Sequence, residues 1–198
     1  MTEIVVFHHV QGLTPGIVAF ANRLRTDGHT VHTPDLFDGK TFPTLEEGIE
    51  HASSIGFGKI MERGVREAQA LAPELVYIGF SMGVMPAQQL AQTREGARGA
   101  VLIDSCIPLG EFGERWPDGV AVQVHGMESD PIFAGEGDLD AARALVDSAD
   151  QAELFLYPGS VHLFVDSSLP TYDKEAAELL VQRVVGFLSG LGDPARNA

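Results

Sequence analysis

The segment VYIGFSMGVMPAQQ, residues 76–89, joins an apolar run to a helical pattern through a serine that has a glycine two positions away on each side. The apolar run is typical of a buried strand, and the residues after it have the spacing of a helix. Ser81 therefore stands in a Gly-x-Ser-x-Gly pattern at a sharp strand-to-helix turn. Such a turn exposes its central side chain above a sheet. The segment by itself allows two interpretations of Ser81, a catalytic nucleophile or a residue that fills a tight turn.

The same alternation of apolar runs and amphipathic stretches continues through the whole chain. The predicted strands are residues 3–9, 29–35, 75–80, 99–105, 120–126 and 152–158. The predicted helices are residues 15–28, 44–52, 58–72, 84–94, 138–149 and 172–191. Six strands separated by helices predict an α/β protein with a mostly parallel sheet and helices on both faces. We expect one domain over residues 1–198, with a frayed tail at 192–198.

Composition and charge limit the classes of partner. The chain has 198 residues, with 13 Lys plus Arg against 28 Asp plus Glu, and a formal net charge of -15. A chain this acidic repels phosphate backbones and anionic membrane surfaces, so we expect neither nucleic acid nor membrane as a partner. Its one cysteine allows no disulfide framework, and no secretion signal is visible at its N-terminus, so a cytoplasmic location is expected. We expect a small-molecule substrate and a monomer or a homodimer.

Two residues that follow later strands can act as partners of Ser81. Ligands of a doubly wound sheet bind outside the carboxyl ends of its strands. Asp130 follows the fifth predicted strand, in HGMESDP, and His162 follows the sixth, in YPGSVHLF. A serine hydroxyl needs a base within hydrogen-bonding reach, and the base needs an acid that orients it. The chain order Ser81, Asp130, His162 is that of a serine hydrolase triad on this fold, and the backbone N–H of Met82 can stabilise an oxyanion in the same space.

Each member of this set also has a structural interpretation. Asp130 precedes Pro131, and Asp-Pro is a frequent turn signal. His162 can be an ordinary loop histidine. Asp138 and Asp140 also follow the fifth strand, but they lie so close to the next predicted helix that we expect them to be capping residues. The order and the placement of the three triad candidates after strands favour the catalytic interpretation.

Further candidates for the pocket follow the fourth and sixth strands. Cys106 lacks the glycine turn of a nucleophile and is expected to be a small buried hydrophobe. Asp104, beside it, is either a plain strand-end residue or a pocket residue that tunes the histidine or contacts substrate. Ile107 and Phe164 are apolar and can be pocket walls or core residues. No pair of histidines has metal-ligand spacing with a supporting carboxylate, so we expect neither a metal nor another cofactor.

Several motifs together resemble one known family. HHVQGLTPG at residues 8–16, GFSMG at 79–83, the HG-x3-DP loop at 125–131 and YPGSVHLF at 157–164 are similar to the dienelactone hydrolase family of α/β hydrolases. The resemblance implies an α/β-hydrolase fold without a large cap domain, and hydrolysis of an ester or lactone. It maps the triad onto the three residues above. It also implies that the backbone N–H of Val10 is the second oxyanion donor. His9 and Gln11, on either side of Val10, are candidates for the substrate pocket.

Three positions depart from the pattern of that family. Its members typically carry a cysteine nucleophile where this chain has Ser81. A glutamate after the first strand corresponds to His9, and an arginine that holds a substrate carboxylate corresponds to Asp166. A site with an aspartate in place of that arginine should not favour an anionic lactone. These departures leave open a different function, either a ligand-binding protein without catalysis or a non-hydrolytic enzyme that uses the same pocket.

Overall fold

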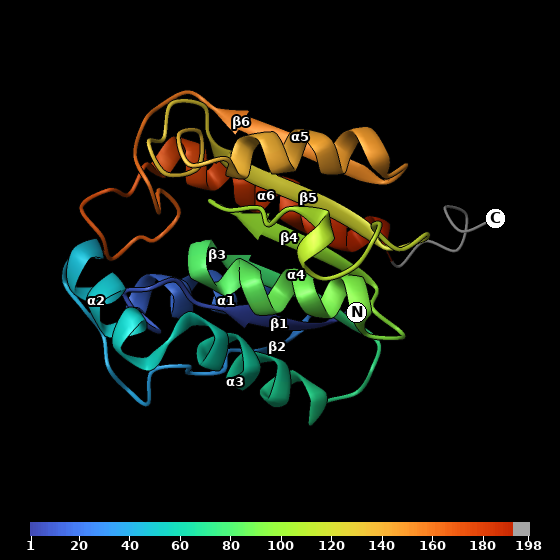
Figure 1. Ribbon diagram of the computed structural model, residues 1–198, viewed down its shortest axis with the longest axis horizontal. Helices are drawn as coiled ribbons and strands as arrows, with labels where there is room; N and C mark the ends of the chain where they lie inside the picture. The colour runs from blue at the N-terminus through green and yellow to red at the C-terminus, as the bar shows by residue number, and fades with distance from the viewer. Residues whose placement is uncertain (192–198) are drawn as a thin grey trace.

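Six parallel strands form one sheet in the order β2-β1-β3-β4-β5-β6 in the computed structural model, which describes residues 1–191. The chain begins in the interior of the sheet, adds one strand on one side, returns across the first strand and then proceeds outward to β6 (Figure 1). The strands are β1 (Glu3–Phe7), β2 (Thr30–His32), β3 (Leu75–Phe80), β4 (Gly99–Ile103), β5 (Ala121–Met127) and β6 (Ala152–Tyr157). All five strand pairs are parallel, so the carboxyl ends of the strands meet at one edge.

Helices cover both faces of this sheet. The helix α1 (Pro15–Thr26) and the long α6 (Lys174–Gly190) pack on one face, and α3 (Phe57–Gln69), α4 (Val84–Thr93) and α5 (Asp138–Ser148) pack on the other (Figure 1). Each face has its own apolar cluster. Burial on both sides explains why β3 and β4 are apolar at every position, since helices exclude water from both faces of an inner strand. The predicted α/β architecture is thus confirmed.

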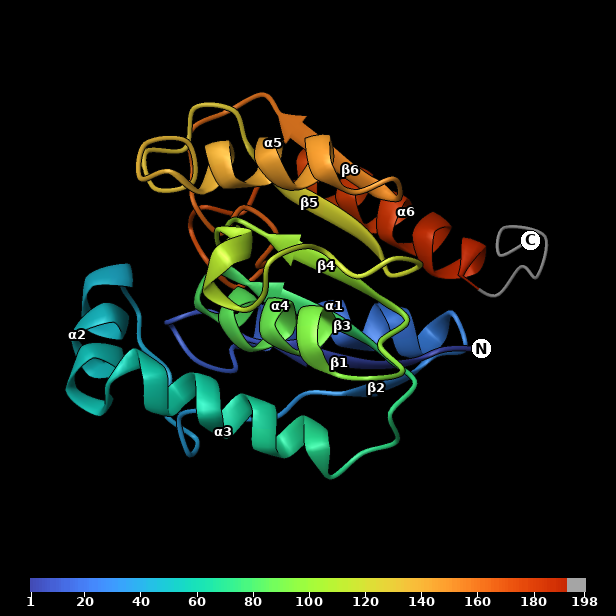
Figure 2. The same ribbon diagram turned by 45° about the vertical axis from the view of Figure 1, so that its right-hand side comes forward.

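The helix α2 (Leu45–Ile55) differs from the others because it lies at the carboxyl edge of the sheet. Figure 2 shows it at the end of the molecule toward which the strand arrows point. Thr44 caps its first turn by accepting a hydrogen bond from the Glu47 N–H, and Gly56, at φ +94°, ends it. Gly48 lies so close to the loop after β1 that a Cβ there would be 2.4 Å from the Val10 carbonyl oxygen. The segment from residue 36 to 58 therefore packs directly against a loop of the predicted site.

All the predicted helices and strands are present, but β2 covers only Thr30–His32 of the strand predicted at 29–35. Pro86 lies in the first turn of α4, where it is tolerated. The connection between β4 and β5 contains a short 3-10 turn, Leu109–Glu111. Among the described residues, no helix is both long enough and apolar enough to cross a membrane. The frayed tail predicted at 192–198 lies outside the residues that the structure describes.

Candidate active site

The turn that carries Ser81 is possible only because of the glycines that flank it. Ser81 has φ +48°, a left-handed conformation that is uncommon for a residue with a side chain. A Cβ at Gly79 would lie 2.4 Å from the Gly83 carbonyl oxygen, and a Cβ at Gly83 would lie 2.4 Å from that of Phe7. The turn therefore packs backbone against backbone on the end of β1. This close packing lifts the Ser81 side chain to the carboxyl edge of the sheet, where it is partly exposed.

Ser81, His162 and Asp130 form one continuous chain of hydrogen bonds. The Nε2 atom of His162 lies 2.9 Å from Ser81 Oγ, and its Nδ1 atom lies 2.6 Å from Asp130 Oδ2. The other oxygen of Asp130 accepts a hydrogen bond from the Ile132 N–H at 2.9 Å. Asp130 thus makes the local turn that was the alternative interpretation and also contacts the histidine. The arrangement has the distances that a base needs for a hydroxyl and that an acid needs for the base.

The environment of His162 favours its protonated form. Burial acts to lower the pKa of the imidazole, but the hydrogen bond to Asp130 and the charges of Asp104, Asp130 and Asp138 outweigh burial and raise that pKa above its ordinary value. A histidine in such surroundings is well suited to receive a proton during a reaction, because the positive charge that develops on it is stabilised. The electrostatics therefore fit a general base at this position.

The loop that holds Val10 is fixed on several sides. Gly12 donates its N–H to the His9 carbonyl at 3.0 Å, and Gln11 donates its own to His9 Nδ1 at 3.2 Å. The Gln11 backbone carbonyl accepts from the Phe42 N–H at 3.0 Å, while its side-chain amide donates to the Phe42 carbonyl at 3.1 Å. Val10 and Met82 follow β1 and Ser81 respectively, as the predicted oxyanion donors must. Their role stays a prediction.

The side chains of His9 and Gln11 are held inside the protein. His9 is fully buried, and its Nε2 atom lies 2.8 Å from Asp166 Oδ2. Asp166 also accepts hydrogen bonds from the Thr14 hydroxyl and from the N–H and hydroxyl of Ser168. Thr14 and Ser168 were not among the predicted site residues, although Thr14 stands before Pro15 in the position of a helix cap. These residues stabilise the loops of the site, and they leave Asp166 with no exposed carboxylate.

The other pocket candidates lie largely in the interior. Cys106 is fully buried, and burial raises the pKa of its thiol to about 12, so it carries no thiolate at neutral pH. Phe164 is fully buried and packs on Tyr157 at a ring distance of 5.1 Å. Ile107 is partly buried and donates its backbone N–H to Gln88 Oε1. Asp104 is fully buried at the end of β4, close to His162.

The expectation that Asp138 and Asp140 cap the helix α5 is wrong, because no side chain makes a cap hydrogen bond there. The N-cap of α5 is Gly137, and its left-handed conformation leaves Asp138 as the first helical residue. The Asp138 carboxylate instead accepts a hydrogen bond from the Cys106 N–H at 3.3 Å, across the space between α5 and the loop after β4. Burial raises the pKa of this carboxyl group. The sequence shows that Asp138 lies near the start of a helix, but it does not show the contact of Asp138 with Cys106, 32 residues away.

Two members of the triad, together with Asp104, form a group that resembles a set of metal ligands. Ligand-type atoms of Asp104, Asp130 and His162 all lie within 4.8 Å of one another. However, His162 Nδ1 and Asp130 Oδ2 are 2.6 Å apart, whereas two ligands of one tetrahedral zinc ion are separated by about 3.3 Å. We therefore assign that contact to a hydrogen bond. The absence of a metal cofactor stays a prediction.

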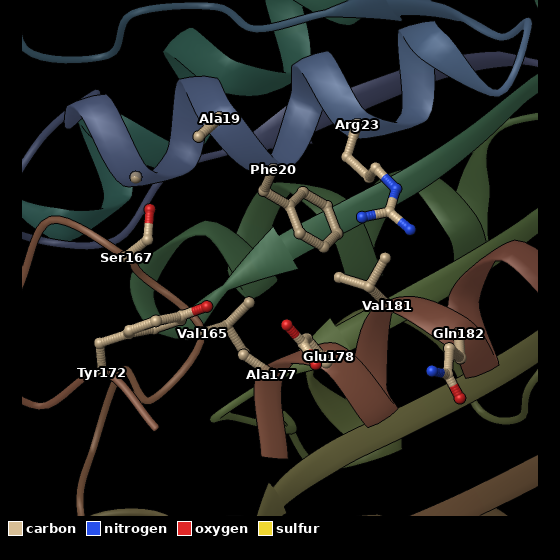
Figure 3. A pocket seen from close by; sticks show the side chains of 11 residues that line it. Ala19, Phe20, Arg23, Val165, Ser167, Tyr172, Ala177, Glu178, Val181 and Gln182 are labelled. Atoms are coloured by element: carbon tan, nitrogen blue, oxygen red, sulfur yellow. The ribbon is translucent and has the colours of Figure 1, made fainter. Parts of the chain in front are cut away.

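A separate groove of about 450 Å³ lies between α1 and α6. Figure 3 shows Phe20 and Arg23 on one side and Val181 and Gln182 on the other, with Tyr172 near one end. Ser81 does not line this groove. Its charged side chains, Arg23 and Glu178, are exposed. The groove therefore offers no arrangement comparable to the hydrogen-bonded chain at the edge of the sheet.

The sheet order, the glycine-flanked serine turn and the histidine and aspartate after later strands define an α/β hydrolase. Residues 1–191 match the dienelactone hydrolase family, and the chain belongs to that family. The resemblance deduced from the sequence is thereby confirmed. Membership makes the protein a hydrolase of the class that acts on ester or lactone bonds.

Individual relatives agree with this assignment. A protein named "Putative carboxymethylenebutenolidase" from Saccharolobus solfataricus is 25% identical over an alignment of 228 positions, which covers 93% of this chain and 88% of that protein. The crystal structure of a "Putative Dienelactone Hydrolase" from Klebsiella pneumoniae has 18% identity and a TM-score of 0.72, covering 96% of this chain and 87% of its own. A dienelactone hydrolase-like promiscuous phosphotriesterase from metagenomic libraries has 18% identity and a TM-score of 0.71, with the same coverage of 96% and 87%. At these identities the solved structures establish the fold.

Proposed function

We propose that the protein is a serine hydrolase that cleaves an uncharged carboxylic ester or lactone through an acyl-enzyme on Ser81. The observation that carries this proposal is the unbroken hydrogen-bonded chain from Ser81 Oγ through His162 to Asp130, with distances of 2.9 and 2.6 Å. The name of the Saccharolobus solfataricus relative, "Putative carboxymethylenebutenolidase", supports a lactone carbonyl as the reacting group, although the substrate in that name carries a carboxylate.

The proposed reaction has two halves that use the same groups. His162 Nε2 takes the proton from Ser81 Oγ while that oxygen attacks the carbonyl carbon. The N–H groups of Val10 and Met82 stabilise the negative oxygen of the tetrahedral intermediate. The imidazolium, oriented by Asp130, then gives its proton to the leaving alkoxide. Water releases the acyl group by the same route, with His162 again as base. Protein side chains and water carry every proton, so the proposal requires no cofactor.

The charge around the site supports an uncharged substrate. The position at which the family places an arginine for a substrate carboxylate holds Asp166, whose oxygens are engaged with His9, Thr14 and Ser168. That position therefore offers an anionic substrate no cation. The overall charge of -15 disfavours anionic ligands further, because it repels them at long range. We accordingly propose a neutral small molecule as substrate.

A serine-directed fluorophosphonate probe and a series of short p-nitrophenyl esters and lactones test this proposal. Wild-type protein should be labelled on Ser81. It should release p-nitrophenol with a burst from esters whose acyl-enzyme is hydrolysed more slowly than it forms. Ser81→Ala should lose labelling, and its rate should fall by roughly 10⁴-fold or more. Ser53→Ala, at an exposed position on α2, is the matched control and should behave as the wild type.

Two results would count against the proposal. The first is wild-type protein that the probe does not label. The second is ester turnover that is equal in the wild type and in Ser81→Ala. Retention of a ligand without turnover, unaffected by Ser81→Ala, would instead support the ligand-binding alternative.

A further inference from the structure

A second carboxylate, that of Asp104, lies close to His162 and Asp130, which are called the catalytic pair below. Its side chain is completely buried at the end of β4. Its Oδ2 atom accepts a hydrogen bond from the Leu163 N–H at 3.2 Å, but its Oδ1 atom has no hydrogen-bond partner among residues 1–191. A buried carboxylate oxygen without a partner is costly, so native proteins seldom retain one without a reason.

The backbone holds Asp104 in this place. Its φ of +59° is left-handed, and its N–H donates to the His125 carbonyl on the neighbouring strand at 2.8 Å. Leu163, whose N–H donates to Asp104 Oδ2, also has a left-handed φ of +61°. Residues with side chains rarely adopt this conformation unless their surroundings impose it. Two such residues joined by a hydrogen bond indicate that the fold imposes a specific contact between the loop after β4 and the loop that carries His162.

The contact brings Asp104 close to both members of the catalytic pair. The ligand-type atoms of Asp104, Asp130 and His162 lie within 4.8 Å of one another. Leu163 is the residue directly after His162, so the hydrogen bond from its N–H fixes the backbone beside the imidazole. Asp104 can therefore act on the histidine in two ways, through the position of the loop and through its charge.

We propose that Asp104 is a second acid for His162, a positioning residue that fixes the histidine loop through the Leu163 N–H and shares with Asp130 the stabilisation of the imidazolium. This inference rests on the proposed function, because only a reacting His162 makes an imidazolium during turnover. Asp130 holds the proton-bearing Nδ1 side of the ring, and Asp104 adds a second negative charge to the same buried space. No proton has to leave Asp104 in either half of the reaction.

The protonation of the three groups is coupled. Burial raises the pKa of Asp104 to about 7, with a further rise from Asp130, against the opposing effects of His162 and the Leu163 N–H. Two buried carboxylates that lie close together are unfavourable when both are ionised, unless a positive charge compensates them. Asp104 and His162 therefore titrate as a pair rather than singly.

Two other carboxylates act on this pair from the neighbouring elements, Asp130 after β5 and Asp138 at the start of α5. The charge of Asp104 in turn helps to raise the pKa of Tyr157, at the end of β6, for which burial is the main cause. Asp138 raises the pKa of His162 through space, but its carboxylate is bound to the Cys106 N–H rather than to the histidine loop. This difference makes Asp138 a useful control for a simple charge effect.

A double-mutant cycle with Asp104→Asn and Asp130→Asn tests the inference. Asparagine keeps an oxygen that accepts the Leu163 N–H, so the loop contact survives while the charge is removed. Asp104→Asn alone should lower kcat/KM by less than about 10-fold, because Asp130 remains. Asp130→Asn alone should cost roughly 10²-fold, and the double variant roughly 10⁴-fold or more, which is greater than the product of the single effects. Asp138→Asn should show no such excess loss when combined with Asp130→Asn.

The imidazole of His162 gives a second readout that does not need turnover. In Ser81→Ala protein, NMR titration of the His162 ring should show a lower pKa when Asp104→Asn is added, because a nearby negative charge is lost. If wild-type protein turns over no ester, the proposed function fails while this titration still reports the coupling. Single effects on kcat/KM that only multiply, or a His162 titration unchanged by Asp104→Asn, would overturn the inference.

Discussion

His9 and Asp166, which are 157 positions apart in the chain, form a buried pair in which His9 Nε2 lies 2.8 Å from Asp166 Oδ2. The Gln11 N–H donates to the other ring nitrogen, so the proton of the imidazole lies on Nε2 and faces the carboxylate. The pair joins the loop after β1, which holds Val10, to the loop after β6, which holds His162. The loop with the proposed oxyanion donor and the loop with the proposed base are thus connected by a buried contact.

Breaking this pair should be costly to the fold. Asp166→Ala should lower the free energy of unfolding by about 3 to 5 kcal/mol, because it leaves His9, Thr14 and Ser168 with unsatisfied hydrogen-bonding groups. Urea denaturation followed by circular dichroism measures this loss. Asp147→Ala, at an exposed position on α5, is the control and should change stability by no more than about 0.5 kcal/mol. Equal stability of the two variants would show that the pair contributes nothing.

The serine turn should reject even one methyl group. Gly83→Ala would place a Cβ 2.4 Å from the Phe7 carbonyl oxygen, and backbone cannot move aside as a side chain can. We expect a loss of more than about 3 kcal/mol in stability, measured by urea denaturation, or no folded protein. Gly186→Ala is the matched control in α6, where a Cβ meets nothing within 4 Å. That change should stabilise the protein by roughly 0.5 to 1 kcal/mol, because alanine favours a helix interior.

Cys106 should be inert toward thiol reagents in the folded protein. Its side chain is fully buried, and burial raises the pKa of the thiol to about 12. Iodoacetamide at pH 8 should therefore leave native protein unmodified and fully active, since the thiolate is the reacting form. The same reagent in 6 M guanidinium should modify Cys106 completely, as mass spectrometry can show. Rapid modification of the native protein with loss of activity would instead point to a reactive thiol in the site.

His125 should make the fold sensitive to mild acid. Burial is the main cause that lowers its pKa from 6.5 to about 3, and the charge of Arg183 adds to the shift. The unfolded chain takes up a proton below pH 6.5 while the folded protein does not, so stability should fall as the pH drops from 6.5 toward 3. Urea denaturation at several pH values in this range measures the slope. His125→Gln should reduce that slope by up to one proton, whereas an unchanged slope would exclude His125 as its source.

The sequence predicted the elements of the fold and the order of the triad because both depend on local patterns. Buried parallel strands are apolar at every position, and the glycines around Ser81 reveal a turn with no space for side chains. Asp130 and His162 could be placed because parallel strands bring their carboxyl ends to one edge. These inferences needed only periodicity and chain order.

Contacts between distant loops could not be read in the same way. His9 is a pocket candidate by its position after β1, yet its side chain turns inward to Asp166. Asp138 has the position of a helix cap, yet it binds the loop after β4. In both cases the direction of one side chain decides the partner, and that direction depends on tertiary packing rather than on spacing.

The close approach of Gly48 to the Val10 carbonyl has a practical meaning for protein engineering. The segment from residue 36 to 58 looks like a part that could be exchanged for that of a relative in order to alter substrate preference. However, α2 leaves no space for a side chain where Gly48 meets the Val10 carbonyl. Phe42 is also hydrogen-bonded to both the backbone and the side chain of Gln11. Grafting a new segment would therefore disturb the proposed oxyanion donor, and chimeras should lose rate on all substrates together rather than gain a new preference.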